Sequence, residues 1–147
     1  MIQSKQCRVN TPQWKLNVSI SSEPEQGSEL VGTIREKLVE LQWPDNDIFK
    51  IHLALEEVVM NAIKHGNKLD PQKNISVVCT IEPELFTADI ADQGEGFVRQ
   101  DVPDPTREEN LYRESGRGLT IVENFMTSVE YIGCGNLVKM RKKKSSP

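Results

Sequence analysis

The stretch from Asp92 to Gly96 has residue types and a spacing suited to chemistry. It reads Asp-Gln-Gly-Glu-Gly, which places a carboxylate at the end of an expected strand and Gly94 and Gly96 directly after it. Because glycine adopts positive φ freely, a turn of this kind can lie against a flat ligand or a phosphate. The Asp92 carboxylate can accept hydrogen bonds from an amine. Taken alone, an ordinary strand-ending Asp–Gly turn explains the pattern equally well.

A second pair of glycines, Gly116 and Gly118, lies where a helix is expected to begin. Free backbone N–H groups and the positive end of the helix dipole favour phosphate at such a position. A flexible entry into the helix explains these glycines equally well. Arg117 lies between them, and pairing with Glu114 or Glu123 fits the sequence as well as contact with a phosphate.

Glu57 and Asn61 are one helical turn apart, opposite the apolar stripe of an expected helix. A solvated helix face is the simplest interpretation of this pair. However, Leu53 and Met60 flank Glu57 on the same side, which favours a second contact surface such as a lined pocket. There, Asn61 offers a hard oxygen ligand for Mg²⁺ and Glu57 can accept a proton from an attacking hydroxyl group.

The elements expected to position these residues are identified by hydrophobic periodicity and by turn residues. They are a strand over Trp14–Ile20, helices over Ser22–Leu41 and from Asp45 or Asp47 to Gly66, a hairpin of Ile75–Ile81 and Leu85–Ala91, a loop over Val98–Glu114, a helix from Ser115 to Phe125, and a hairpin of Val129–Ile132 and Leu137–Met140. This order of helices and antiparallel hairpins predicts an α+β fold, with one sheet and helices on one of its faces.

Length and charge restrict the classes of function. The 147 residues predict a single domain over 1–147, with a core at about 11–142 and a solvated basic tail at 141–147. The formal net charge of −4 makes broad binding to nucleic acid an unfavourable hypothesis. No apolar run approaches the ~18 residues of a membrane span. Three widely spaced cysteines, without a metal-binding pattern, favour a reducing, cytoplasmic environment.

Three segments in this order resemble the motifs of a known superfamily. Glu57-Val-Val-Met-Asn61, followed by His65-Gly66, resembles the N box of the histidine-kinase-like (GHKL) ATPases. Asp92 to Gly96 resembles their G1 box, and Gly116-Arg-Gly-Leu119 resembles their G2 box. Within the superfamily, the close-set boxes and the stretch from 115 to 126 are most similar to bacterial anti-sigma factor serine/threonine-protein kinases. The resemblance covers roughly residues 11–142.

The resemblance implies a Bergerat-type two-layer α/β sandwich with a mixed, mostly antiparallel sheet, and it implies binding of ATP with Mg²⁺. It assigns the catalytic base to Glu57 and the metal to Asn61. The cofactor-binding residues that it implies are Asn61, Asp92 for the adenine amine, Gly94 and Gly96 for the turn facing the nucleotide, and Gly116 and Gly118 for the phosphates, with Arg117 between them as a further candidate.

The resemblance also implies a function. It predicts a cytoplasmic, homodimeric regulator that phosphorylates a serine of an anti-sigma factor antagonist and sequesters a sigma factor or a similar regulator. An alternative is a non-catalytic module that binds its partner and uses ATP only as a switch. A small ATPase or metabolite kinase is a third, weaker hypothesis.

Overall fold

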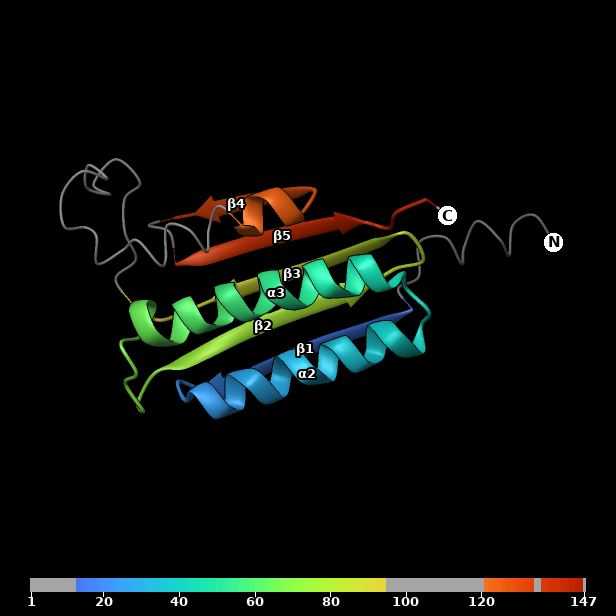
Figure 1. The fold of residues 1–147 in the computed structure, drawn as a ribbon. Helices are drawn as coiled ribbons and strands as arrows, with labels where there is room; N and C mark the ends of the chain where they lie inside the picture. Colours follow the sequence, from blue (N-terminus) through green and yellow to red (C-terminus); the bar gives the residue numbers. More distant parts are fainter. Residues whose placement is uncertain (1–12, 95–120, 134–135, 147) are drawn as a thin grey trace, which may run out of the picture.

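The computed structural model describes residues 13–94, 121–133 and 136–146 (Figure 1). In chain order the elements are β1 (Trp14–Ser21), α2 (Pro24–Glu40), α3 (Asp45–Asn61), the π-helix η1 (Ala62–Gly66), β2 (Asn74–Ile81), β3 (Leu85–Ala91), β4 (Ser128–Ile132) and β5 (Leu137–Lys143). Residues 121–125 are also helical. They match the end of the third expected helix, whose predicted start lies outside the described residues.

The five strands form one sheet in the order β1-β2-β3-β5-β4. Each of the four pairings between described strands is antiparallel, where the expectation had allowed a mixed sheet. The register aligns apolar side chains across the sheet, because Val18 faces Val77, Val77 faces Ile90, and Ile90 faces Val138. The predicted α+β class and the mostly antiparallel sheet are confirmed.

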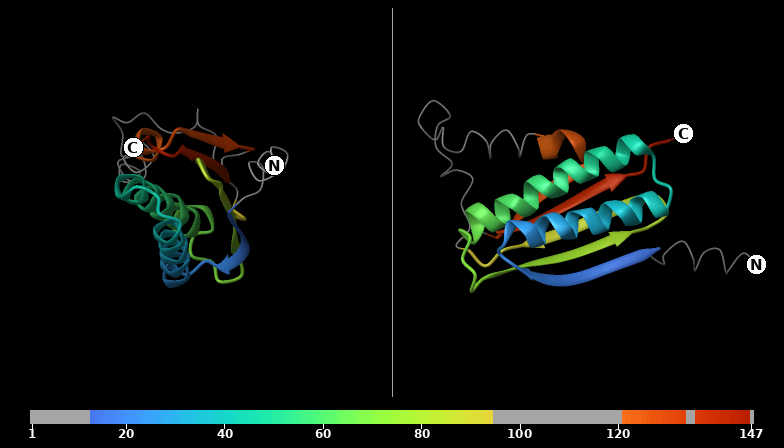
Figure 2. Two further views of the ribbon diagram at one scale, coloured as in Figure 1. Left: turned by 90° about the vertical axis from the view of Figure 1, so that its right-hand side faces the viewer. Right: turned by 60° about the horizontal axis from the view of Figure 1, so that its bottom comes forward.

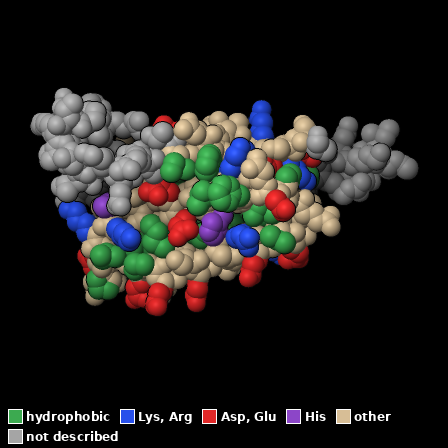
Figure 3. Space-filling view, in the orientation of Figure 1, with side chains coloured by type: hydrophobic (Ala, Val, Ile, Leu, Met, Phe, Trp, Pro, Cys, Tyr) green, Lys and Arg blue, Asp and Glu red, His purple; other side chains and the backbone are tan. Residues whose placement is uncertain are grey.

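Helices α2 and α3 lie side by side on one face of this sheet, so the molecule has two layers (Figure 2). Their apolar stripes face the strands, as the periodicity predicts. Burial of a Leu or Ile side chain contributes about 1.5–3 kcal/mol of hydrophobic stabilisation. The largest fully buried side chains join both layers: Phe86, Ile34, Leu38, Ile51, Leu55, Ile63, Ile75, Ile81, Ile90, Met140, Val31 and Val59. The surface seen in Figure 3 intersperses hydrophobic side chains with charges of both signs.

Helix α3 is followed directly by a π-helix. The sequence predicted one α-helix up to Gly66, but the α-helix ends at Asn61 and the last five residues form the π-helix η1. The backbone N–H of Asn67 donates to the Ala62 carbonyl oxygen, five residues earlier, at 2.8 Å. The wider turn places the Gly66 backbone against the end of β3. Short π segments of this kind are frequent at functional sites.

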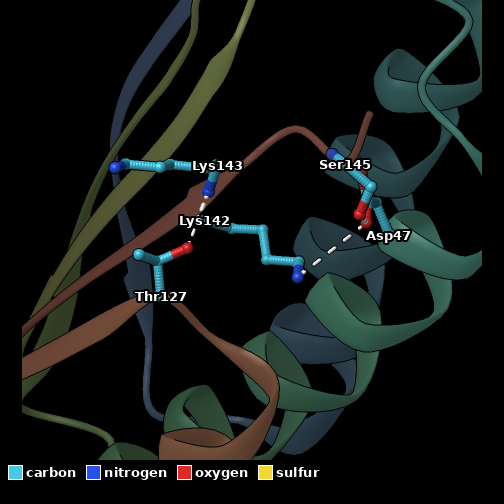
Figure 4. A network of polar contacts seen from close by, with 5 residues as sticks. All are labelled: Asp47, Thr127, Lys142, Lys143 and Ser145. Atoms are coloured by element: carbon cyan, nitrogen blue, oxygen red, sulfur yellow. Dashed lines mark hydrogen bonds and ion pairs between the residues drawn. The ribbon is translucent and has the colours of Figure 1, made fainter. Parts of the chain in front are cut away.

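The basic segment near the C-terminus is not the solvated tail that the sequence predicted. Strand β5 extends to Lys143, and the following residues return to the start of α3 (Figure 4). Asp47 is completely buried, and its carboxylate accepts hydrogen bonds from the N–H and the hydroxyl group of Ser145 at 2.8 and 2.6 Å. The Lys142 ammonium lies 3.8 Å from the same carboxylate. A buried carboxylate is costly unless it is paired and hydrogen-bonded. The contacts of Asp47 with Lys142 and Ser145 therefore hold the C-terminal segment against α3.

The sequence placed the start of this helix at Asp45 or Asp47; the α-helix begins at Asp45, and Asp47 is a buried residue of its first turn. The N-cap residue of α3 is Pro44, which makes no side-chain cap hydrogen bond. Lys144 adds a further contact, because its ammonium lies 5.6 Å from the centre of the Trp43 ring. We call the contacts of Asp47 with Lys142 and Ser145 the C-terminal clasp.

Candidate functional site

Asp92 follows the last residue of β3 and has a half-buried side chain. Its backbone N–H donates to the Asn136 carbonyl oxygen at 2.9 Å, which joins the end of β3 to the residue before β5. One carboxylate oxygen accepts the Gly94 N–H at 2.8 Å. Burial raises the pKa of the Asp92 carboxyl group, while the Gly94 hydrogen bond and the charge of Lys73 act in the opposite direction. The carboxylate is thus held in place by its own turn.

Two glycines pack directly against this carboxylate. A Cβ atom added to Gly66 would overlap the Asp92 carboxylate, and one added to Gly94 would overlap the Gly66 carbonyl group. The end of η1 and the turn after β3 therefore meet backbone to backbone, with Asp92 between them. Gly94 was expected to face a nucleotide, which stays a prediction; the structure shows that a side chain at Gly94 would not fit against Gly66.

Glu57 and Asn61 lie on α3, which leads into this junction. Both side chains are half-buried, and so are Leu53 and Met60 beside them. The flank of α3 that holds Glu57 is therefore partly covered, unlike a fully solvated helix face. Asn61 is the last residue of the α-helix, and η1 connects it directly to Gly66.

Asn67 is a residue of this region that no sequence motif marked. Its side chain is 0% exposed and makes hydrogen bonds to three different segments. An asparagine that follows a helix-ending glycine is ordinary turn chemistry. The sequence therefore contained no signal that distinguished Asn67 from any other turn residue.

Four of the predicted site residues lie in the described part of the chain: Glu57, Asn61, Asp92 and Gly94. The structure places Asp92 and Gly94 together with Gly66, at the end of the helix that carries the other two. Gly96, Gly116, Arg117 and Gly118 lie outside the described residues. The helical turn at 121–125 that follows them is anchored in the core by Val122 and, just after it, Met126.

The residues present fit a purine nucleotide. A half-buried carboxylate beside a backbone without side chains suits a flat base that carries an exocyclic amine. The Asn61 carboxamide is a suitable hard ligand for Mg²⁺. Among residues 13–94, 121–133 and 136–146, no group of three or more His, Cys, Asp or Glu side chains could hold a metal ion. Mg²⁺ commonly keeps phosphate and water oxygens among its ligands and uses few protein side chains.

Two further features of the described chain lie outside this region. The Cys79 thiol is buried in the sheet, and burial raises its pKa to about 12, so it stays protonated and unreactive at neutral pH. Within the described ranges, no helix is long and apolar enough to cross a membrane.

Comparison with known proteins decides the family. Residues 20–142 match the histidine kinase-like ATPase domain. The chain belongs to this family. Similar proteins include the anti-sigma F factor of Oceanobacillus iheyensis, which is 34% identical over 106 residues that cover 68% of this chain and 72% of the relative. The anti-sigma F factor of Halalkalibacterium halodurans is 30% identical over 123 residues, covering 80% and 82% of the two chains.

A solved structure supports the same fold. The RsbU and RsbW domains of a Mycobacterium tuberculosis protein match with a TM-score of 0.62 and 18% sequence identity. The match covers 90% of this chain and 32% of the other, so this chain spans about a third of that protein chain. The predicted Bergerat-type fold and the resemblance to the anti-sigma branch of the family are confirmed.

Proposed function

We propose that this protein is an ATP-binding anti-sigma regulatory factor with protein serine/threonine kinase activity. It transfers a phosphoryl group to a serine of an antagonist protein and sequesters a sigma factor or a similar regulator. One observation carries the proposal. The Asp92 carboxylate packs against Gly66 and Gly94 at the end of the helix that carries Glu57 and Asn61.

Each residue has a defined part in nucleotide binding. Asp92 accepts a hydrogen bond from the adenine amine, and the close packing of Gly66 and Gly94 around the carboxylate holds it in position for the base. Asn61 holds Mg²⁺, which neutralises phosphate charge when it is bound. The family resemblance adds Gly96, Gly116, Arg117 and Gly118 as the residues that contact the nucleotide and its phosphates.

Glu57 acts as the general base in the transfer step. Its carboxylate accepts the proton of the substrate serine hydroxyl as the serine oxygen attacks the γ-phosphorus atom. A bond forms between serine oxygen and phosphorus, and the bond from phosphorus to the β–γ bridging oxygen breaks, which releases ADP. Glu57 is one turn before Asn61, so the base and the metal ligand project from the same flank of α3.

The names of the relatives support the choice of partners. Several proteins that match most of this chain are anti-sigma F factors. We therefore assign a sigma factor and its antagonist protein as the partners, and a homodimer in the cytoplasm as the working state. The whole chain, 1–147, acts as one domain in this proposal, with its core at about 11–142.

The test combines the purified protein, Mg-ATP and a candidate antagonist-type protein. We expect one phosphoserine on the antagonist, detected by mass spectrometry, and loss of sigma-factor binding when unphosphorylated antagonist is added. Stabilisation by ATP without any phosphorylated partner would favour the non-catalytic switch. Steady ATP hydrolysis that is independent of a protein partner would favour a small ATPase. The absence of any ATP binding would reject the proposal as a whole.

A further inference from the structure

We propose that Asn67 is a positioning residue for adenine recognition: it fixes the turn at Gln93 and thereby the Asp92 carboxylate. This inference rests on the proposed function and adds a residue that makes no direct contact with the nucleotide. It starts from an unusual feature, since Asn67 is polar but has no exposed surface.

The hydrogen bonds of the Asn67 carboxamide use both of its ends. The nitrogen donates to the Ser22 hydroxyl oxygen at 2.8 Å and to the Asn74 carbonyl oxygen at 3.0 Å. The oxygen accepts the Gln93 backbone N–H at 2.7 Å. The Ser22 hydroxyl in turn donates to the Lys73 carbonyl oxygen at 2.7 Å. One side chain thus connects the β1–α2 junction, the start of β2 and the turn after β3.

The hydrogen bond from the Gln93 N–H connects Asn67 to the candidate site. Gln93 is held a second time, because its side-chain oxygen accepts the Asn74 N–H at 2.7 Å. Asp92 and Gly94 are its neighbours in the chain, and Gly94 donates to the Asp92 carboxylate. If the Gln93 N–H loses its acceptor, the turn can move, and the direction of the Asp92 carboxylate moves with it. Asn67 therefore influences adenine binding indirectly, through the orientation of the Asp92 carboxylate.

The residues that follow Asn67 have an unusual backbone conformation that is held by hydrogen bonds. Lys68 and Leu69 follow it with φ values of 55° and 60°, in the left-handed region that non-glycine residues rarely adopt. The Leu69 N–H donates to Ile63 and the Asp70 N–H donates to Asn67, at 2.8 and 3.0 Å. A strained backbone of this kind persists only where its surroundings determine it from several sides.

The test compares ATP with inosine triphosphate, which carries a carbonyl oxygen in place of the adenine amine. An ionised Asp92 accepts a hydrogen bond from the amine and repels the carbonyl oxygen, so the parent protein should prefer ATP. Asn67→Ala should reduce this preference by about tenfold, the effect of roughly one hydrogen bond. Affinities are measured by calorimetry well below the melting temperature of every variant.

Ser22→Ala is the matched control. It removes a member of the same buried network but leaves the Asn67–Gln93 bond, so it should lower stability and keep the parent preference for ATP. If Asn67→Ala does not fold, Asn67→Ser replaces it, because a serine side chain is too short to maintain the bond to Gln93. Hydrogen exchange at the Gln93 amide should become faster in either Asn67 variant and stay slow in Ser22→Ala.

The outcomes separate the two proposals. An Asn67 variant that is less stable but keeps the full preference for ATP would overturn the inference and leave a purely structural asparagine. Equal loss of preference in Ser22→Ala would overturn it as well, because any damage to the network would then suffice. A parent protein that binds both nucleotides equally would instead reject adenine recognition by Asp92, and one that binds neither would reject the proposed function as a whole.

Discussion

The Asp92 carboxyl group is placed where its ionisation opposes folding. Burial raises its pKa, so the folded protein binds this proton more tightly than the unfolded chain does. Its contribution to stability is therefore present below the ordinary carboxyl pKa of 3.8 and is lost as the pH rises through the raised value. An amine donor that binds the ionised form offsets part of this cost.

From this sign we expect Asp92→Asn to gain stability relative to the parent protein as the pH rises from about 4 to 7. Urea unfolding at both pH values, without nucleotide, measures the difference. Asp89→Asn, within β3, reports the effect of removing a charge from another half-buried position, where the carboxylate lies 3.6 Å from the Lys139 ammonium. A difference between Asp92→Asn and the parent protein that does not change with pH would contradict the assignment.

Glu57→Gln should reduce the rate of phosphoryl transfer by about 10² or more, because a general base contributes roughly that factor. Its affinity for ATP should stay within a few-fold of the parent value, since the assigned role is proton transfer. Single-turnover transfer to the antagonist and calorimetric titration with ATP measure the two quantities.

Glu56→Gln is the neighbouring control for that experiment. The Glu56 carboxylate lies 3.4 Å from His52 Nε2, its side chain is 47% exposed, and it has no part in the proposed chemistry. We expect its transfer rate to equal that of the parent protein. Parent-like transfer by Glu57→Gln would remove Glu57 from the mechanism.

Where a motif marked individual residues, the sequence predicted that they belong to one site, and their roles stay predictions. The types and spacing of Glu57, Asn61, Asp92 and Gly94 indicated a nucleotide site, and the structure brings these segments to one end of the molecule. Asn67 was missed because its importance comes from complete burial among distant segments, which only the tertiary structure reveals. The roles of Glu57 and Asn61 in catalysis and metal binding stay predictions.

The junction between η1 and the turn after β3 depends on the absence of side chains. Gly66→Ala would place a Cβ atom in the Asp92 carboxylate. We expect it to destabilise the protein by about 1–3 kcal/mol and to weaken ATP binding, because the carboxylate or the helix end must move. Thermal unfolding and nucleotide titration measure the two effects.

Gly32→Ala is a suitable comparison because the same substitution meets no atom within 4 Å on α2. There it should stabilise the helix by roughly 0.5–1 kcal/mol. We therefore expect Gly66→Ala to lower the stability of the protein and Gly32→Ala to raise it. A neutral Gly66→Ala would show that the junction is looser than its geometry indicates.

The C-terminal clasp should contribute substantially to stability. Asp47→Ala leaves the half-buried Lys142 ammonium and the Ser145 donors without their acceptor, so we expect a loss of about 2–4 kcal/mol in urea unfolding. Asp45→Ala is the control, since Asp45 lies in the same first turn but is exposed. It should cost only about 0.3–1 kcal/mol through the helix dipole. Equal losses of stability in the two variants would contradict a stabilising role of the C-terminal clasp.

Hydrophobic periodicity predicted which segments form helices and strands more accurately than it predicted where these elements end. The stripe of Ile51, Leu55 and Val58 predicted the buried face of α3 correctly. The π-helical turn was not predictable from local periodicity, which does not encode the packing of Gly66 against Asp92 and Gly94 in the turn after β3. The basic segment at 141–144 was misinterpreted for a similar reason: its partner, Asp47, is distant in sequence.

For the molecule as a whole, the order of elements predicted the fold class and the family motifs predicted the sandwich, and both are confirmed. The order of strands within the sheet was not predictable from the sequence alone. It depends on a pairing between β3 and β5, which local patterns of residues do not encode. Partners and the oligomeric state rest on resemblance to the anti-sigma branch of the family.

Strand β5 is the last strand along the described chain, yet it lies inside the sheet between β3 and β4. During synthesis, β3 therefore keeps an unpaired edge until residues up to Lys143 have left the ribosome. Open strand edges favour aggregation. We expect released chains that end before Leu137 to be digested rapidly by protease, and chains that end after Ser146 to be resistant. Resistance of the shorter chains would mean that the sheet can close without its inner strand.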